Sequence, residues 1–247
     1  MEIEILLEKT RRLNQLLQKA AGQMISLTEL AQSLRILTEA QVYILDGKGN
    51  LLGQAGEGEF SQTQILPEEV KEGVMKPQAL EWINNQMKAE ANLARKGREG
   101  YCLVVPALGA SGRIATVIYI RDEKNFESGD MLLAEYGANV AAMQIQRNLE
   151  QKLELDARKK TVVQLALEVL SYSELEAVKH IFNEIDGSEG FLVASKLAEE
   201  YRLTRSVIVN ALRKLESAGV IDARSLGMKG TYIKVLNDFL YQELAAI

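Results

Sequence analysis

The spacing of apolar residues along the first forty positions predicts two helices. From residue 3 to residue 20 apolar side chains recur every three or four positions, which is typical of an amphipathic helix. Leu27–Leu37 has a similar spacing, and Ser26 with Glu29 three residues later has the pattern of a capping box. The chain is therefore expected to begin with two helices that each bury one face.

After residue 40 the apolar residues no longer recur every three or four positions, and the new pattern predicts β-structure. Residues 42–52 contain an apolar run, a glycine-containing turn and an apolar continuation, which together predict a β-hairpin. Residues 102–120 predict a second hairpin, whose return strand is rich in β-branched residues. Between the hairpins the chain is punctuated by glycine and proline, and a helix is predicted around Ala79–Lys96.

One long helix is predicted after the second hairpin. From Gly129 to about Leu170 there is no proline, and only Gly137 interrupts a roughly helical spacing of apolar residues. The second half of this stretch is heavily charged, so residues 147–170 are expected to form a solvated linker helix. Helices that flank an antiparallel sheet are typical of a sensor domain of the GAF or PAS type.

The strongest local pattern lies between Phe191 and Val235. A short helix is predicted over residues 193–201, and Thr204 is a good N-cap for a second helix, which Gly219 closes. The second helix has an apolar face of Ile208, Ala211, Leu212 and Leu215, and a polar face of Ser206, Asn210, Arg213 and Lys214. Beyond it, two short strands with a flexible tip predict a wing over residues 220–235.

This pattern indicates a winged helix-turn-helix that binds double-stranded DNA. The major groove admits one α-helix, and its base edges are read by forked or amide side chains. From Gly190 to Val235 there are eight Lys and Arg against four Asp and Glu, a net of +4, although the whole chain carries −5. A local basic patch of this kind is compatible with DNA binding. The candidate DNA contacts are Ala194, Ser195, Lys196, Thr204, Arg205, Ser206, Val209, Asn210, Arg213, Lys214, Arg224 and Lys229.

The fold class predicted from these elements is α+β, in three parts. Residues 1–146 are expected to form a GAF-type domain for effector sensing and dimerisation. Residues 147–170 are the linker helix, and residues 171–247 are the winged helix-turn-helix domain.

The composition argues against several other classes of protein. Cys102 and His180 are the only cysteine and histidine, so a tetrahedral zinc site would need carboxylates, and no metal site is predicted. No apolar stretch approaches the ~20 residues of a membrane span, and the N-terminus lacks the pattern of a signal peptide, so a cytoplasmic protein is expected. No P-loop spacing occurs, and neither a cofactor nor catalytic activity is predicted.

Two other kinds of function stay open at this point. The chain could be a non-enzymatic GAF-type signalling protein whose C-terminal half binds a protein instead of DNA. It could also be an enzyme, such as a nucleotide hydrolase. The missing P-loop and the lack of a Ser, His and Asp constellation argue against the enzyme.

A family resemblance adds to this interpretation. Residues 204–221 read TRSVIVNALRKLESAGVI and resemble the recognition helix of the CodY family of global transcriptional repressors. Residues 225–237 read SLGMKGTYIKVLN and are similar to the wing of that family. The segments 170–177 (LSYSELEA) and 133–138 (LAEYGA) also match, and a similarity is recognisable in residues 5–53.

The resemblance implies partners and effectors that the residue pattern alone does not. Members of the CodY family are cytoplasmic homodimers of low-GC Gram-positive bacteria that bind an A·T-rich inverted repeat and repress genes of nutrient limitation. Branched-chain amino acids and, in many members, GTP raise their affinity for DNA. The sensor would then be a GAF domain.

The effector pocket is predicted around the loop of residues 60–75. Apolar residues of this loop could wall a pocket against the sheet. A ligand carboxylate would need a partner, because a buried unpaired charge is costly. The candidates are the nearby cations Arg95 and Arg98, or backbone N–H groups near Gly100. The chain departs from the family at residues 60–64, which lack the family's Arg-Met stretch, whereas Leu66-Pro67 is the counterpart of its Phe-Pro. The candidate effector contacts are Phe60, Ile65, Leu66, Pro67, Val70, Val74 and Arg98.

Overall fold

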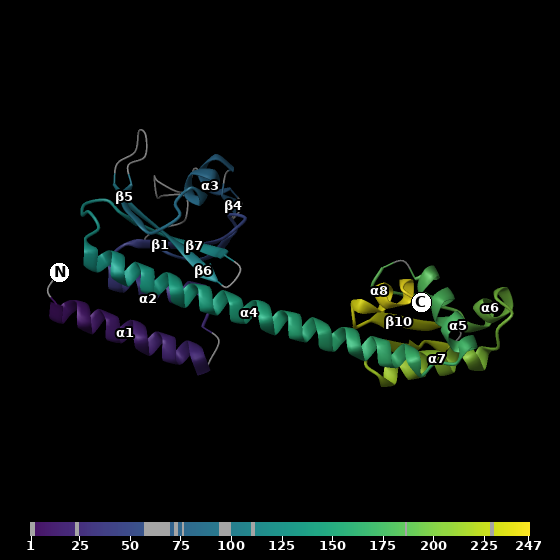
Figure 1. Ribbon diagram of the computed structural model, residues 1–247. Coiled ribbons are helices and arrows are strands. Elements are labelled where there is room, and N and C mark those ends of the chain that lie inside the picture. Colours follow the sequence, from purple (N-terminus) through teal and green to yellow (C-terminus); the bar gives the residue numbers. More distant parts are fainter. Residues whose placement is uncertain are drawn as a thin grey trace. The chain divides into compact units, whose positions relative to one another are not determined.

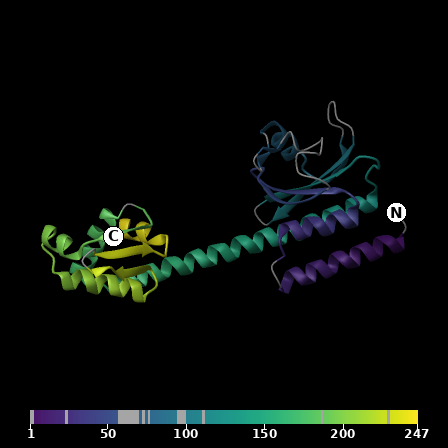
Figure 2. The ribbon, with the colours of Figure 1, turned by 180° about the vertical axis from the view of Figure 1, so that it is seen from behind.

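Two compact units make up the chain, Met1–Leu149 and Glu150–Ile247. The computed structural model describes residues 3–22, 25–56, 70–71, 74–75, 77–93, 100–109, 112–185, 187–227 and 230–247 (Figures 1 and 2). Within these ranges, no helix combines the length and the apolar character that a membrane span requires.

The first unit is built on an antiparallel sheet with the strand order β2-β1-β7-β6-β5. A separate pair of very short strands, β3 and β4, is also antiparallel. The elements of this unit are α1 (Ile3–Gly22), α2 (Leu27–Thr38), β1 (Gln41–Asp46), β2 (Leu51–Ala55), β3 (Val70–Lys71), β4 (Val74–Met75), α3 (Pro77–Asn84), β5 (Glu90–Leu93), β6 (Tyr101–Gly109), β7 (Gly112–Arg121) and the first part of α4 (Ser128–Glu168).

Both faces of the sheet are covered. Figure 1 and Figure 2 show α2 and α4 along one face, with α1 on the outer side of these two helices. Val42 and Ile44 point to this helical side and belong to its core cluster. Tyr43 and Leu45 point the other way and pack with Ile83 of α3. This alternation is expected from the period of two in a β-strand.

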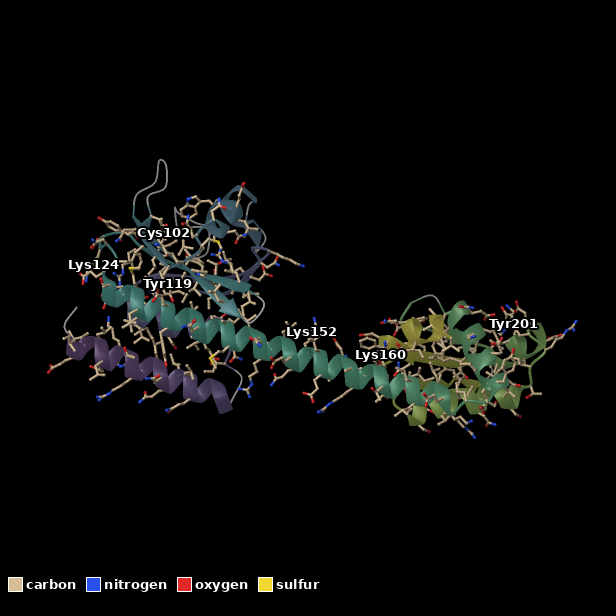
Figure 3. All side chains as sticks on the ribbon, in the orientation of Figure 1. Cys102, Tyr119, Lys124, Lys152, Lys160 and Tyr201 are labelled. Carbon is tan, nitrogen blue, oxygen red and sulfur yellow. The ribbon has the colours of Figure 1, made fainter. Side chains whose placement is uncertain are left out.

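Tyr119 of β7 joins the sheet to α4. Its side chain is fully buried, and its hydroxyl donates to the carbonyl oxygen of Ala134 at 3.2 Å (Figure 3). Burial raises the pKa of the Tyr119 hydroxyl, so it remains a neutral donor. A buried hydroxyl with a partner avoids the cost of an unsatisfied polar group.

The predicted helices and hairpins of the first unit are confirmed, with one exception. Ser26 and Glu29 form the expected capping box, in which the Glu29 amide donates to the Ser26 hydroxyl at 3.1 Å and the Ser26 amide donates to the Glu29 carboxylate at 3.0 Å. The long helix is also confirmed, since α4 runs unbroken from Ser128 to Glu168.

The helix expected around Ala79–Lys96 is wrong in its second half. The chain leaves the helix after Asn84 and forms strand β5 against β6. Asn92 adopts a left-handed conformation with φ 56°, at the point where the register of this pair shifts. Ala91 therefore packs with the helical side of the sheet, whereas Leu93 packs with the α3 side. Strand pairing has overridden the local helix propensity of these residues.

The second unit combines helices with a small antiparallel sheet of order β8-β10-β9. The α+β class is thereby confirmed for the chain. The sequence pattern predicted the two strands of the wing but not the third strand, β8. The elements are the end of α4, α5 (Tyr172–Glu184), β8 (Glu189–Leu192), α6 (Ala194–Glu200), α7 (Arg205–Ser217), β9 (Ile221–Ser225), β10 (Thr231–Val235) and α8 (Phe239–Ala245).

The last turns of α4 pack into the second unit. Val163 is fully buried in the core of this unit. The Asn237 side-chain amide donates to the Lys159 carbonyl oxygen at 2.9 Å, and Lys160 (Figure 3) forms an ion pair with Glu243 at 3.3 Å. The end of the segment expected to be a solvated linker helix thus contributes to the core of the second unit.

Candidate nucleic-acid interface

Helices α6 and α7 form a helix-turn-helix with well-defined ends. The turn is closed by the Leu203 amide, which donates to the Ala198 carbonyl oxygen at 2.9 Å. Arg202 takes the left-handed conformation, with φ 55°, that a small residue would adopt with less strain. Thr204 caps α7 as predicted, because its hydroxyl accepts from the Val207 amide at 3.3 Å.

Helix α7 divides into a buried and an exposed face as the sequence predicted. The buried residues are Ile208, Ala211, Leu212 and Leu215. Ser206, Asn210 and Arg213 are exposed and follow one another at intervals of four and three residues. They therefore line one side of the helix, with side chains that can donate to and accept from base edges.

The remaining candidate contacts of the two helices are arranged around this face. Ser195 and Lys196 of α6 are exposed, as are Thr204 and Arg205 at the start of α7. Ala194 and Val209 are half-buried. The amino-terminal end of α7 also presents backbone N–H groups, which are suited to a phosphate oxygen.

Strands β9 and β10 form the wing, which follows α7 in the same unit. Arg224 on β9 is 70% exposed in its side chain and pairs with Asp222 at 2.8 Å. The strand β10 returns in register, with Tyr232 opposite both Arg224 and Phe191. Lys229, the predicted contact at the wing tip, lies outside the described residues.

The ammonium group of Lys214 bonds to two acceptors within the protein. Its Nζ donates to the Glu174 carboxylate at 2.7 Å and to the Val169 carbonyl oxygen at 3.1 Å. Sequence periodicity grouped Lys214 with the polar face of α7. It did not reveal Glu174 as the partner, although the Ser171 and Glu174 spacing signals a capping box at the start of α5.

The predicted effector residues of the first unit cannot be placed as a site. Phe60, Ile65, Leu66, Pro67 and Arg98 lie outside the described residues. Val70 and Val74 lie on the paired strands β3 and β4, of which the structure describes the backbone but not the side chains.

A cavity of about 640 Å³ opens where α2 ends and β7 ends, near Lys124 (Figure 3). Its wall mixes the basic residues Arg35, Arg121 and Lys124 with the acidic residues Glu39, Asp122 and Glu123. The wall charges therefore favour neither an anionic nor a cationic ligand. In the part of the chain that the structure describes, no group of three His, Cys, Asp or Glu side chains could hold a metal ion.

The comparisons with known proteins place the chain in a family. A family model described as "CodY GAF-like domain" matches residues 5–169. The chain belongs to the CodY family. A second model, "CodY helix-turn-helix domain", matches residues 188–246. The first unit is accordingly a GAF-type domain, and the second contains the helix-turn-helix of this family.

Curated relatives are similar over nearly the whole chain. The "Global transcriptional regulator CodY" of Thermoanaerobacter sp. (strain X514) is 47% identical over 97% of both chains. The protein of the same name from Geobacillus kaustophilus (strain HTA426) is also 47% identical over 97% of both. A solved structure, the cofactor-binding GAF domain of the nutrient sensor CodY from Clostridium difficile, is 28% identical, with a TM-score of 0.43, and covers 59% of this chain and 99% of that one.

Proposed function

We propose that this member of the CodY family is a DNA-binding global transcriptional regulator, mainly a repressor. The observation that carries the proposal is the exposed row of Ser206, Asn210 and Arg213 on a helix that matches the CodY helix-turn-helix model. Whole-length relatives named global transcriptional regulators support it. The alternative, a C-terminal half that binds protein, has no comparable support.

The GAF domain is proposed to sense nutrient status through small effectors. Branched-chain amino acids are the first candidates and GTP is the second. The protein is proposed to act in the cytoplasm as a homodimer on an A·T-rich inverted repeat, because two equivalent recognition helices would match two half-sites. Its role as a regulator without catalytic activity belongs to the same proposal.

Selection of bound duplexes from random-sequence DNA, followed by gel-shift titration, tests this function. The wild-type protein should enrich an A·T-rich inverted repeat. Its affinity for the selected duplex should rise when isoleucine, leucine, valine or GTP is added. Failure to enrich any duplex sequence, with the protein folded, would reject DNA regulation and favour a protein-binding C-terminal half.

Arg213 and Asn210 are expected to specify sequence. Replacing either residue by alanine should cost about 1–3 kcal/mol on the selected duplex, because each side chain can make paired hydrogen bonds to a base edge. The loss on random DNA should be smaller. Gel-shift titration on both duplexes measures the difference. Equal losses on the two would assign the residue to phosphate contact instead.

Isoleucine is expected to stabilise the GAF domain. A ligand that binds only the folded state raises the free energy of unfolding by mass action, by about 2.7 kcal/mol at a hundred times its dissociation constant. Thermal unfolding can be followed by fluorescence of Trp82, the only tryptophan, which lies on α3 of this domain. Arg98→Ala should reduce the shift more than the control Lys88→Ala. If millimolar isoleucine, leucine and valine changed neither the melting temperature nor the affinity for DNA, sensing of branched-chain amino acids would be excluded.

A further inference from the structure

The ammonium group of Lys214 lies where three helices of the second unit meet. Its two acceptors are the Glu174 carboxylate on α5 and the carbonyl oxygen of Val169, the residue that follows α4. Carbonyl groups at a helix C-terminus have no partner within the helix and carry partial negative charge. Lys214 therefore joins α7 to the end of α4 and to the beginning of α5.

The Glu174 carboxylate makes two interactions at this junction. It is the N3 residue of α5, and its carboxylate accepts from the Ser171 amide at 2.7 Å as well as from Lys214. Only 9% of its side chain is exposed. The hydrogen bond from Lys214, followed by the one from the Ser171 amide, lowers the pKa of this carboxyl. The Glu174 carboxylate is thus charged and nearly buried, and its position is fixed by its hydrogen bond at the start of α5.

The position of Lys214 on α7 separates it from the residues that face outward. Successive residues of an α-helix are about 100° apart, so Lys214 is turned away from Arg213 toward the flank that packs against α5. Its ammonium is bound there by two acceptors of the protein. Two of the three N–H donors of this ammonium are thus used within the protein, and a DNA contact that drew Lys214 away from Glu174 would leave a nearly buried carboxylate without its partner, which is costly.

We propose that Lys214 is a positioning residue, which fixes the DNA-reading helix to the junction of α4 and α5 through Glu174 and Val169. This inference rests on the proposed function, because it assumes that α7 reads DNA. It removes Lys214 from the set of phosphate contacts. It also makes the Lys214 bridge a polar contact between α7 and the end of α4.

A positioning lysine and a phosphate-binding lysine have different effects on DNA binding. Each phosphate contact contributes about 0.9 to the slope of log affinity against log salt concentration, on specific and random DNA alike. A positioning residue leaves this slope unchanged. Its loss misaligns the base-reading side chains, so it reduces affinity for the selected duplex much more than affinity for random DNA.

The experiment uses full-length Lys214→Met and Glu174→Gln variants, and the double variant. Glutamine retains an oxygen acceptor for the Ser171 amide, so the capping box is kept while the charge is removed. The double variant contains no uncompensated carboxylate and should recover stability that Lys214→Met loses. Lys152→Met is the matched control, since Lys152 is an exposed lysine of the same unit, lies outside the helix-turn-helix and the wing, and its replacement removes the same charge. Lys214→Arg keeps a cation in place of the ammonium.

Affinities are measured by gel shift over a range of salt concentrations, on the duplex selected by the wild type and on random DNA. We expect Lys214→Met and the double variant to bind the selected duplex about tenfold more weakly, which corresponds to about 1.4 kcal/mol. Their salt slopes and their affinities for random DNA should equal those of the wild type. Lys214→Arg and Lys152→Met should bind both duplexes like the wild type.

Two results would overturn the proposal. A salt slope that falls by about one unit in Lys214→Met, but not in Lys152→Met, would identify a phosphate contact. Wild-type affinity in the stable double variant would show that the bridge serves stability alone. If the wild type selects no duplex at all, it is the proposed function that has failed, so the two failures are distinguishable.

Discussion

Replacing Asp130 by alanine is expected to lower the free energy of unfolding of the GAF domain by about 3–5 kcal/mol, because the change leaves a buried arginine without its counter-charge. Arg121 and Asp130 face each other in a two-pronged ion pair, with both Nη–Oδ distances at 2.9 Å. Their side chains are only 7% and 4% exposed. This is the largest effect of a single substitution that we expect in this domain.

The Arg121 guanidinium is held in place by further contacts besides Asp130. The Arg121 guanidinium also donates to the carbonyl oxygens of Thr38 and Asn125 and lies over the Phe126 ring, 4.5 Å from its centroid. One pair thus ties together the ends of α2 and β7 and the start of α4. Without Asp130, the guanidinium would retain its carbonyl partners but lose the carboxylate that neutralises it within this buried cluster.

The same pair predicts a pH dependence. Burial is the largest influence on the Asp130 carboxyl and raises its pKa, but the hydrogen bonds from Arg121 and the Glu127 amide, with the charge of Arg121, outweigh burial and lower the pKa overall. A lowered folded-state pKa means that this stabilisation is fully present above the unfolded-state pKa of about 3.9 and is lost as the pH falls through the folded-state value. The difference between wild type and Asp130→Ala should therefore shrink below about pH 4.

Urea unfolding followed by Trp82 fluorescence measures the stability of this domain in the full chain. Glu8→Ala is the control, because it breaks an exposed ion pair with Arg12, in which the Arg12 and Glu8 side chains are 59% and 66% exposed. This control should cost no more than about 0.5 kcal/mol. A loss in Asp130→Ala as small as that of the control would contradict the burial of the Arg121 pair.

Gly230→Ala is expected to disrupt the wing and with it DNA binding. Gly230 has φ +96°, and a Cβ there would lie 2.4 Å from the Leu192 carbonyl oxygen. Left-handed backbone strain and the displacement of a neighbouring strand together should cost about 2–4 kcal/mol of stability in the second unit. Thr231, the residue after Gly230, pairs with Leu192. The displacement of Leu192 should therefore spread along the paired strands β8 and β10.

Gly227→Ala is the matched control in the same loop. Gly227 also has a positive φ, +64°, but a Cβ there would meet nothing within 4 Å. Its replacement should cost only the backbone strain of about 1–2 kcal/mol. Both variants are compared by amide hydrogen exchange of β8 and β10 and by gel-shift affinity for the selected duplex. Equal protection and equal affinity in the two would show that the contact with Leu192 does not constrain the wing.

Local patterns in the sequence determined most elements of this protein. The capping residues Ser26 and Thr204 mark helix starts because the hydrogen bonds that they make lie within three residues along the chain. The two faces of α7 follow from the 3.6-residue period of its apolar side chains, and the hairpins follow from pairs of apolar runs with a turn between them. The long, specific segments of residues 204–221 and 225–237 were by themselves sufficient to indicate the CodY family.

Only the tertiary structure decided the features that depend on residues far apart in the sequence. Strand β5 replaced a predicted helix because β6 offered backbone partners that no local pattern reveals. Arg121 reaches Thr38, 83 positions away, and Lys214 reaches Glu174, 40 positions away. A helical wheel places Lys214 among the polar residues of α7, but it cannot show which charged group lies opposite. Sequence periodicity fixes which face of an element is polar, whereas the partner of each polar group is set by the packing of the elements.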